Sequence, residues 1–297
     1  MTDPPAASPH PAVSVVIATW NTRDLVCGAL AALGRTDLPD PWEVIVIDNG
    51  SQDGTVDAIK ARFPATVLLC NAANTGYAHA NNQGIAAARG RHVLLLGSDT
   101  EVRPETLRVM AGFLDARPEA AAVACRLVNP DGSPQMSCRR FPRLRDAVAT
   151  YLSLHFLARR YTMHGFDFFA SREVDQPAAT CLMVRREVLN GLRGFDESYR
   201  ILYNDVDLCK RLHDMGGRIF FTGETEVLHY GSVTTRSAPA GIRMEMYRNI
   251  LLYFRRNRGP VAQWVLAPLL SVRLFMVTRS LRAFSLLAVP REGTERT

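Results

Sequence analysis

The stretch Ile45-Val-Ile-Asp48-Asn-Gly-Ser-Gln-Asp-Gly54-Thr55 decides the fold class of this chain. Its apolar start is rich in β-branched residues, which predicts a buried strand, and the Asn, Asp and Gly residues that follow predict a turn. Residues 53–63 are then predicted to form a helix. A strand, a polar turn and a helix in this order are the repeating element of sheets built from parallel strands.

The same alternation runs along most of the chain. Strands are predicted at 13–18, 43–47, 66–70, 92–96, 121–128, 180–184, 218–221 and 226–228. Helices are predicted at 24–33, 53–63, 77–89, 104–117, 206–215 and 242–256. This alternation indicates an α/β fold with a mostly parallel sheet, in which ligands bind beyond the carboxyl ends of the strands.

The composition is that of a folded protein. The chain has 297 residues, of which 47% are hydrophobic and 22% charged. That length allows one large domain or two small ones, and that composition excludes wholesale disorder. Residues 1–12 are rich in Pro and Ala, have no secretory signal pattern, and are expected to be a disordered leader.

Charge is distributed unevenly. Residues 236–297 hold 11 Arg and 3 acidic residues, a net charge of +8, whereas residues 1–235 hold 24 basic and 26 acidic residues, a net charge of −2. This asymmetry indicates an anionic surface as partner. Because residues 261–289 are apolar between their arginines, we predict one or two amphipathic helices lying on an anionic membrane, and no nucleic-acid partner. A helical hairpin packed on the domain itself is the alternative.

The six cysteines contain no Cys-x-x-Cys pair, and most of them lie in apolar runs. They are therefore expected to be buried free thiols rather than zinc ligands or a redox pair. This usage of cysteine indicates a reducing, cytoplasmic compartment.

Three segments place polar residues where predicted strands end. Asp48 follows the strand quoted above, and its carboxylate can accept the N3–H of a uracil or thymine base. Gly76 precedes the helix at 77–89, whose N-terminus favours a phosphate. Asp99 follows the strand at 92–96 and is a candidate metal ligand, because divalent ions on diphosphates are held by one or two carboxylates. Simpler roles are a helix N-cap for Asp48 and close packing for Gly76.

Taken together, these segments resemble glycosyltransferase family 2, the inverting nucleotide-sugar transferases with the GT-A fold. Further similarity to the family, over about residues 13–258, lies in Val13-Ser-Val-Val-Ile-Ala-Thr19-Trp-Asn21, Gly194-Phe-Asp-Glu197, Asp205-Val-Asp207-Leu208, Glu226-Val-Leu-His229 and Tyr247-Arg-Asn249. The last of these is similar to the C-terminal helix of bacterial rhamnosyltransferase-like members.

The resemblance implies roles for particular residues. Asp205 is the implied general base, and Asp99 and His229 are the implied ligands of Mg²⁺ or Mn²⁺. The residues implied to bind the nucleotide-sugar are Ala18, Thr19, Asn21, Asp48, Asn49, Gly76, Tyr77, Asn82, Ser98 and Asp99. The reaction would be a single displacement, in which the base takes the proton of the attacking hydroxyl and the sugar carbon inverts.

The resemblance also implies a division of the chain. Residues 13–235 would be the GT-A catalytic domain, with a nucleotide-sugar half at 13–128 and an acceptor half at 129–235. Residues 236–297 would be basic amphipathic C-terminal helices.

Some positions leave alternatives open. By sequence alone Asp205 would be a helix N-cap, and His229 a core or loop histidine. The family commonly has Asn-Pro-Asp where this chain has Gly97-Ser98-Asp99, so the Asp is retained and the two residues before it differ. Asn204 replaces a frequent Glu before the base, and Gln176 stands where a Trp is usual.

The sequence thus predicts an enzyme that moves a sugar from a UDP- or dTDP-sugar, with dTDP-rhamnose as one candidate, to a hydroxyl of a glycan or lipid-linked acceptor. We expect a bacterial enzyme of cell-wall or polysaccharide biosynthesis that is peripheral on the inner face of the plasma membrane. The sequence leaves open whether the protein forms a homodimer. The alternative from another class is a noncatalytic nucleotide-sugar-binding scaffold of a glycan assembly complex.

Overall fold

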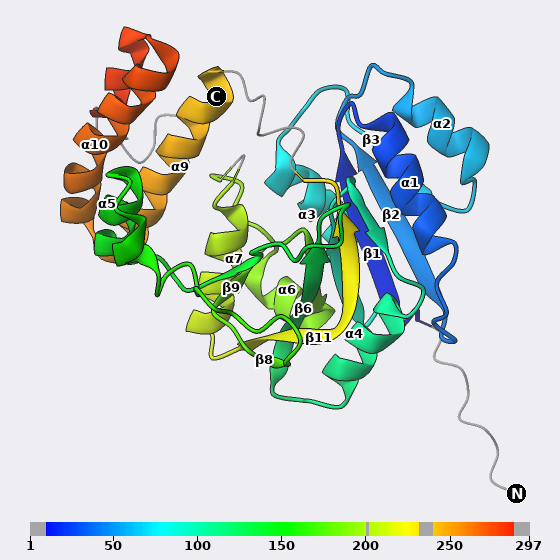
Figure 1. Cartoon of the computed structure of the whole chain (residues 1–297). Coiled ribbons are helices and arrows are strands. Elements are labelled where there is room, and N and C mark those ends of the chain that lie inside the picture. The colour runs from blue at the N-terminus through cyan, green and yellow to red at the C-terminus, as the bar shows by residue number, and fades with distance from the viewer. Residues whose placement is uncertain (1–9, 200–201, 232–239, 288–297) are drawn as a thin grey trace, which may run out of the picture. The chain divides into compact units, whose positions relative to one another are not determined.

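The computed structural model describes residues 10–199, 202–231 and 240–287, and it divides the chain into two compact units (Figure 1). The larger, which we call the sheet unit, comprises Met1–Arg139, Gly165–Arg200 and Asn204–Ser232. The smaller, which we call the helical unit, comprises Arg140–His164, Ile201–Tyr203 and Val233–Thr297. Residues 1–9 of the predicted leader lie outside the described residues.

The sheet unit is built on a mixed sheet with the strand order β3-β2-β1-β4-β10-β6-β11-β5, in which β8 also pairs with β11. The strands are β1 (Val13–Thr19), β2 (Trp42–Asp48), β3 (Val67–Cys70), β4 (His92–Leu96), β5 (Thr100–Val102), β6 (Ala120–Val128), β8 (Arg172–Glu173), β10 (Cys181–Arg185) and β11 (Arg218–His229). The strands β3, β2, β1 and β4 are parallel neighbours, and so are β6 and β11. Strand β10 runs antiparallel between β4 and β6. The predicted α/β fold with a mostly parallel sheet is confirmed.

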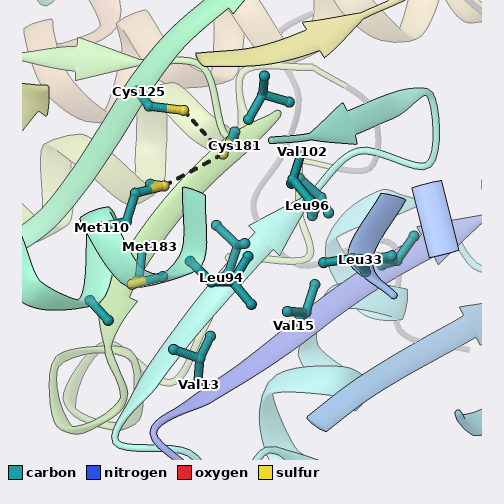
Figure 2. Close-up of a cluster of buried hydrophobic side chains, with 14 of the residues drawn as sticks. Val13, Val15, Leu33, Leu94, Leu96, Val102, Met110, Cys125, Cys181 and Met183 are labelled. Carbon is teal, nitrogen blue, oxygen red and sulfur yellow. Dashed lines mark hydrogen bonds between the residues drawn. The ribbon is translucent and has the colours of Figure 1, made fainter. Parts of the chain in front are cut away.

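Helices pack on both faces of this sheet. The helices of the sheet unit are α1 (Arg23–Leu33), α2 (Thr55–Arg62), α3 (Tyr77–Ala87), α4 (Thr106–Asp115), α6 (Arg186–Leu192) and α7 (Asn204–Asp214). One face joins alternate residues of β1, such as Val13 and Val15, to Leu33 of α1 and Met110 of α4 in a single buried cluster (Figure 2). The period of two along the strand explains why these positions share a face.

The opposite face of β1 and β2 receives α3 through a glycine. A Cβ atom on Gly84 would lie 2.4 Å from Cγ1 of Val16 and 2.6 Å from Cδ1 of Ile47, so only a glycine allows this close approach. Helix α3 therefore lies directly on the strands whose carboxyl ends carry the candidate site.

Sulfur atoms form part of the buried core. Sγ of Cys125 lies 3.6 Å from Sγ of Cys181, which in turn lies 3.9 Å from Sδ of Met110 (Figure 2). All six cysteines are free, and all but Cys70 are buried, as the sequence predicts.

The helical unit contains α5 (Leu144–Tyr151), the 3₁₀ helix η1 (His155–Ala158), α9 (Ala240–Arg258), α10 (Pro260–Thr278) and the 3₁₀ helix η2 (Leu281–Leu287). The helices α9 and α10 are joined by Gly259, whose φ of 82° permits the sharp connection. By length and composition α10 is long and apolar enough to cross a membrane, although part of it is buried inside the protein. The grouping of 140–164 with the C-terminal helices differs from the predicted boundary at 129–235.

Two predictions need correction. The separate strands expected at 218–221 and 226–228 are parts of one strand, β11, whose register against β6 shifts between Thr222 and Glu226. In the irregular stretch at 135–175 the structure has α5 and η1, together with β7 (Cys138–Arg139), which pairs with β9 (Gln176–Pro177), and β8. These elements are too short, or too rich in arginine, to give a periodic apolar pattern.

Candidate active site

The predicted donor residues gather at the carboxyl edge of β1, β2 and β4. In the parallel register Thr19 lies opposite Asp48, and Ala18 lies opposite Ile47. The hydroxyl of Thr22 lies 2.7 Å from that of Thr19 and donates to Oγ of Ser98 over 3.3 Å, which links the loop after β1 to the loop after β4. Three loops that are distant in sequence are thereby held at one edge.

Asp48 is buried at this edge with one oxygen engaged. Its Oδ2 accepts the backbone N–H of Ser51 over 2.9 Å, whereas the buried Oδ1 has no hydrogen-bond partner. Asp48 is not the N-cap of α2, because that helix begins at Thr55, whose N–H is accepted by Asp53. A buried carboxylate oxygen without a partner is costly, so Oδ1 is positioned to accept a ligand N–H.

Asn49 shapes the loop that leads to α3. Its Oδ1 accepts the backbone N–H of Thr75 over 3.0 Å, and its Nδ2 donates to Oδ1 of Asn74 and to the carbonyl of Gly76. Gly76 has a φ of 92°, which favours glycine before the first turn of α3. Asn49 is thus a positioning residue for the helix N-terminus.

Asn21 and Asn82 also use their side chains within the protein. Oδ1 of Asn21 accepts the N–H of Gln52 over 2.7 Å and joins the loops after β1 and β2. The amide of Asn82 donates to the carbonyl of Phe195 and to Glu197, and its Oδ1 accepts the N–H of Phe195 over 2.7 Å. Asn82 therefore fixes the turn after α6, on the predicted acceptor side rather than the donor side.

Asp99 and His229, predicted as metal ligands, are neighbours. Nε2 of His229 lies 3.4 Å from Oδ2 of Asp99, and the N–H of Tyr230 donates to the carbonyl of Asp99 over 3.0 Å. The other ring nitrogen, Nδ1, lies 2.7 Å from Oε1 of Gln135, whose Nε2 donates to the carbonyl of His229. An amide oxygen accepts from Nδ1–H, so Gln135 holds that side of the ring and leaves Nε2 on the side of Asp99.

Asp205 stands at the start of α7. Its Oδ1 accepts the N–H of Val206 over 2.8 Å, and burial raises the pKa of its carboxyl against the opposing effects of this bond and of the Arg139 charge. The two residues before α7, Leu202 and Tyr203, have φ values of 59° and 64°, which are strained for side chains of this size.

Tyr77 connects the two halves of the site. Burial raises its pKa well above the usual value, and the negative charges of Asp205 and then Asp99 add to the shift. Its ring packs edge-on against Phe195, with centroids 5.8 Å apart. The phenol hydroxyl also donates to the carbonyl of Ala179 over 3.5 Å.

Sequence reasoning missed Gln135 as a member of this site. Gln135 is 94 residues from His229 in sequence, and only the fold brings them together. Arg139 belongs to a run of arginines for which the sequence left two roles open, contact with a lipid diphosphate acceptor or exposure to solvent, and in the structure its charge acts on Asp205.

Comparison with known proteins agrees with this geometry. Residues 14–192 match the model of Glycosyl transferase family 2. An N-acetylglucosaminyl-diphospho-decaprenol L-rhamnosyltransferase of Mycobacterium tuberculosis is 27% identical over 81% of this chain and 84% of its own length. The rhamnosyltransferase WbbL of Escherichia coli is 22% identical over 76% of this chain and 86% of its own length.

Solved structures show the same fold. A mannosyltransferase from Pyrobaculum calidifontis in complex with GDP-Man and Mn²⁺ matches with a TM-score of 0.59 and 22% identity, over 95% of this chain and 80% of the other. TarS of S. aureus in complex with UDP-GlcNAc matches with a TM-score of 0.58 and 18% identity, over 93% of this chain and 78% of the other.

A GT-A fold with acidic residues at the carboxyl edge of its sheet defines a nucleotide-sugar-dependent glycosyltransferase. The chain belongs to glycosyl transferase family 2, with similarity to its rhamnosyltransferases.

Proposed function

We propose that this enzyme transfers a sugar, with inversion, from a UDP- or dTDP-sugar to a hydroxyl of a glycan or lipid-linked acceptor. The observation that carries the proposal is the geometry around Asp99, whose Oδ2 lies 3.4 Å from Nε2 of His229, together with Asp205 in the first turn of α7. One carboxylate lies beside a histidine suited to a cation, and the other is buried with a raised pKa, so they suit different roles.

Asp48 is the residue proposed to recognise the nucleobase of the donor. Its buried Oδ1, which has no partner within the protein, is the proposed acceptor of the N3–H that uracil and thymine both carry, so UDP and dTDP are the proposed donors. The rest of the donor edge, Ala18, Thr19, Gly76 and Ser98, supplies small side chains and backbone to which a nucleotide can lie close. Asn21 and Asn49 hold the loops around it.

Asp99 and His229 fit a divalent cation, Mg²⁺ or Mn²⁺. Gln135 would hold Nδ1–H of His229 while Nε2 binds the cation, and metal-ligating histidines usually have such a partner for their other ring nitrogen. Two protein ligands would leave the other coordination positions of such a cation to phosphate oxygens and water. The bound cation would offset the charge that develops on the leaving diphosphate.

Asp205 is the proposed general base. A carboxylate with a raised pKa is a stronger base than an ordinary one. It would take the proton of the acceptor hydroxyl as that oxygen attacks the sugar carbon. The departing diphosphate leaves from the opposite side of the sugar, so no covalent enzyme intermediate forms.

The similar proteins suggest which donor and which acceptor this enzyme uses. Because two of them are rhamnosyltransferases, and one acts on a diphospho-decaprenol acceptor by name, we propose dTDP-rhamnose as donor and a lipid-linked glycan as acceptor. Membership of the family favours this enzyme over the noncatalytic scaffold. A lipid-linked acceptor would place the protein, as a peripheral enzyme of polysaccharide assembly, on the cytoplasmic face of the plasma membrane.

Calorimetric binding of UDP, dTDP and GDP, with and without Mn²⁺, tests the donor site. We expect Mn²⁺-dependent binding of UDP or dTDP by the full chain, its loss in Asp99→Ala, and its retention in Asp57→Ala, an exposed acid on α2. Tighter binding of GDP would overturn the role of Asp48, and equal binding in Asp99→Ala would overturn the role of Asp99.

A further inference from the structure

The helical unit carries a concentration of exposed apolar side chains. Among the described residues, fourteen of the twenty large apolar side chains that are exposed lie in this unit, although it holds about a third of the chain. They are Leu152, Leu154, Phe156, Leu157, Leu202, Val261, Trp264, Val265, Val272, Met276, Val277, Leu281, Phe284 and Leu287. A soluble surface rarely gathers so many, so the unit is built to contact an apolar phase or partner.

Helix α10 has two apolar faces. Ala262, Leu266, Leu270 and Leu274, spaced by four residues, are buried inside the unit. The outer face leaves Trp264 67% exposed, and Val261, Val265, Val272 and Met276 are exposed along with it. Since folding has already used the inner face, the outer face is available to another phase.

A second apolar projection comes from a distant part of the sequence. Phe156 and Leu157 of η1 are 64% and 57% exposed, and Leu152 at the end of α5 is 51% exposed. The guanidinium of Arg273 on α10 donates to the carbonyl of Tyr151 over 3.1 Å, which joins α10 to the end of α5. Figure 1 shows α5 beside α9 and α10.

The charge of the unit indicates which apolar phase it meets. Its residues include 16 Arg and 4 acids, a net charge of +12, which leaves −6 on the sheet unit of a chain whose total is +6. Exposed arginines, namely Arg159, Arg160, Arg279 and Arg282, follow the apolar segments directly. Arginine beside exposed aromatic and aliphatic side chains is complementary to the headgroups and acyl boundary of an anionic bilayer.

The packing of α10 argues against a spanning orientation. The sharp Gly259 connection folds α10 back along α9, and the two helices are in extensive contact. Helix α9 carries Arg243, Arg248, Arg255, Arg256 and Arg258. If α10 crossed the membrane, α9 would have to enter the hydrocarbon with these charges or lose its packing. A helix in the plane of the interface avoids both costs.

We infer that the helical unit is a monotopic platform for anionic phospholipid, in which α10 lies in the plane of the interface and η1 inserts Phe156 and Leu157 as a second contact. This rests on the proposed membrane location and adds to it the orientation and a contact from the middle of the sequence. Two separated apolar projections on one compact unit would fix the tilt of that unit on the membrane, which a single helix does not.

Flotation of the full chain with phosphatidylcholine vesicles, with or without about a third of phosphatidylglycerol, tests the platform. The test variants are Phe156→Glu with Leu157→Glu, and Trp264→Glu with Val265→Glu. The matched control is Val67→Glu with Met215→Glu, which adds the same two charges at side chains that are 41% and 61% exposed on the sheet unit. All three variants replace exposed side chains only, and a melting temperature equal to that of the wild type confirms that each variant is folded.

We expect binding that requires phosphatidylglycerol, weakens with salt, is reversed by alkaline carbonate, and falls about tenfold or more in each test variant but not in the control. Resistance to carbonate would overturn the in-plane orientation. Binding unchanged in Phe156→Glu with Leu157→Glu would overturn the second contact, and no flotation of the wild type would overturn the platform. Nucleotide binding without vesicles is measured separately, so a failure of the proposed enzymatic function is distinguishable from a failure here.

Discussion

Replacing the proposed base should make the protein more stable while it removes activity. The carboxyl of Asp205 has a raised pKa because it is desolvated, so the folded chain holds this proton to a higher pH than the unfolded chain does. As pH rises past the ordinary carboxyl pKa of about 3.9, the unfolded state ionises first and the free energy of unfolding falls. Asp205→Asn keeps an oxygen that accepts the N–H of Val206 and removes the charge.

The expected sizes follow from these contacts. At pH 8 we expect the free energy of unfolding of Asp205→Asn to exceed that of the wild type by about 0.5–2 kcal/mol. Its melting temperature should rise by about 2–4 °C for each kcal/mol. At pH 5 the difference should shrink, because the wild type carries more of the neutral form. Loss of the base should slow sugar transfer about 10²–10⁴-fold, or about 3–5 kcal/mol in the barrier.

Thermal melting at the two pH values and single-turnover sugar transfer measure these effects. A variant that is less stable than the wild type at pH 8 would contradict the desolvation argument. Full activity in Asp205→Asn would refute its role as base, and then the raised pKa would reflect burial alone. Asp207→Asn is a useful contrast, because Asp207 pairs with Arg211 over 2.7 Å and its loss should lower stability.

Three further predictions concern residues that line the candidate site or support the strands beneath it. Gln135→Leu should weaken Mn²⁺ binding in the presence of nucleotide about 10–100-fold, measured by calorimetry, because the His229 ring loses the acceptor for its Nδ1–H; unchanged affinity would show that the ring needs no such support. Gly84→Ala should destabilise the chain by about 1–3 kcal/mol in urea unfolding, since the new Cβ would meet Val16 at 2.4 Å, and an unchanged midpoint would contradict this packing. Asp48→Ala should abolish the preference for UDP or dTDP over GDP in competition binding, whereas a preserved preference would assign base recognition elsewhere.

The sequence predicts most of the fold because each strand and helix of the first half carries its own local signal. Apolar runs such as the one ending at Asp48 are long, and glycines or prolines separate them from amphipathic helices. The strands β7, β8 and β9 have two residues each, and no periodic pattern exists over so short a length. Helix α5 has arginines at 143 and 145 around its start, which hide its apolar face.

The candidate site is predictable only in part. Asp48, Asp99 and Asp205 are found because each follows or precedes a recognisable element, and the resemblance to a family adds their roles. Asn49 and Asn82 were expected to bind the donor, yet their amides hold loops and turns of the protein. Sequence shows that an amide is present, but only the fold decides whether the protein has already used its hydrogen bonds.

The interruption of β11 explains how His229 reaches Asp99. Before the interruption Thr222 lies opposite Cys125 of β6, and after it Glu226 lies opposite Arg126. Strand β11 therefore moves forward by one residue of β6 while its own chain uses four residues. A strand without this bulge would carry its end about 10 Å further along the sheet, three residues at about 3.3 Å each. An odd number of extra residues also exchanges the two faces of the strand.

The bulge is held in place by its own contacts. A Cβ atom on Gly223 would lie 2.4 Å from the backbone of Phe169, so a glycine is required there, and Thr225 is buried against the hydroxyl of Thr106. Beyond it β11 pairs with β5, and His229 lies opposite Thr100, the residue after Asp99. The break that the sequence presents as a gap between two strands is therefore what brings the histidine beside the carboxylate.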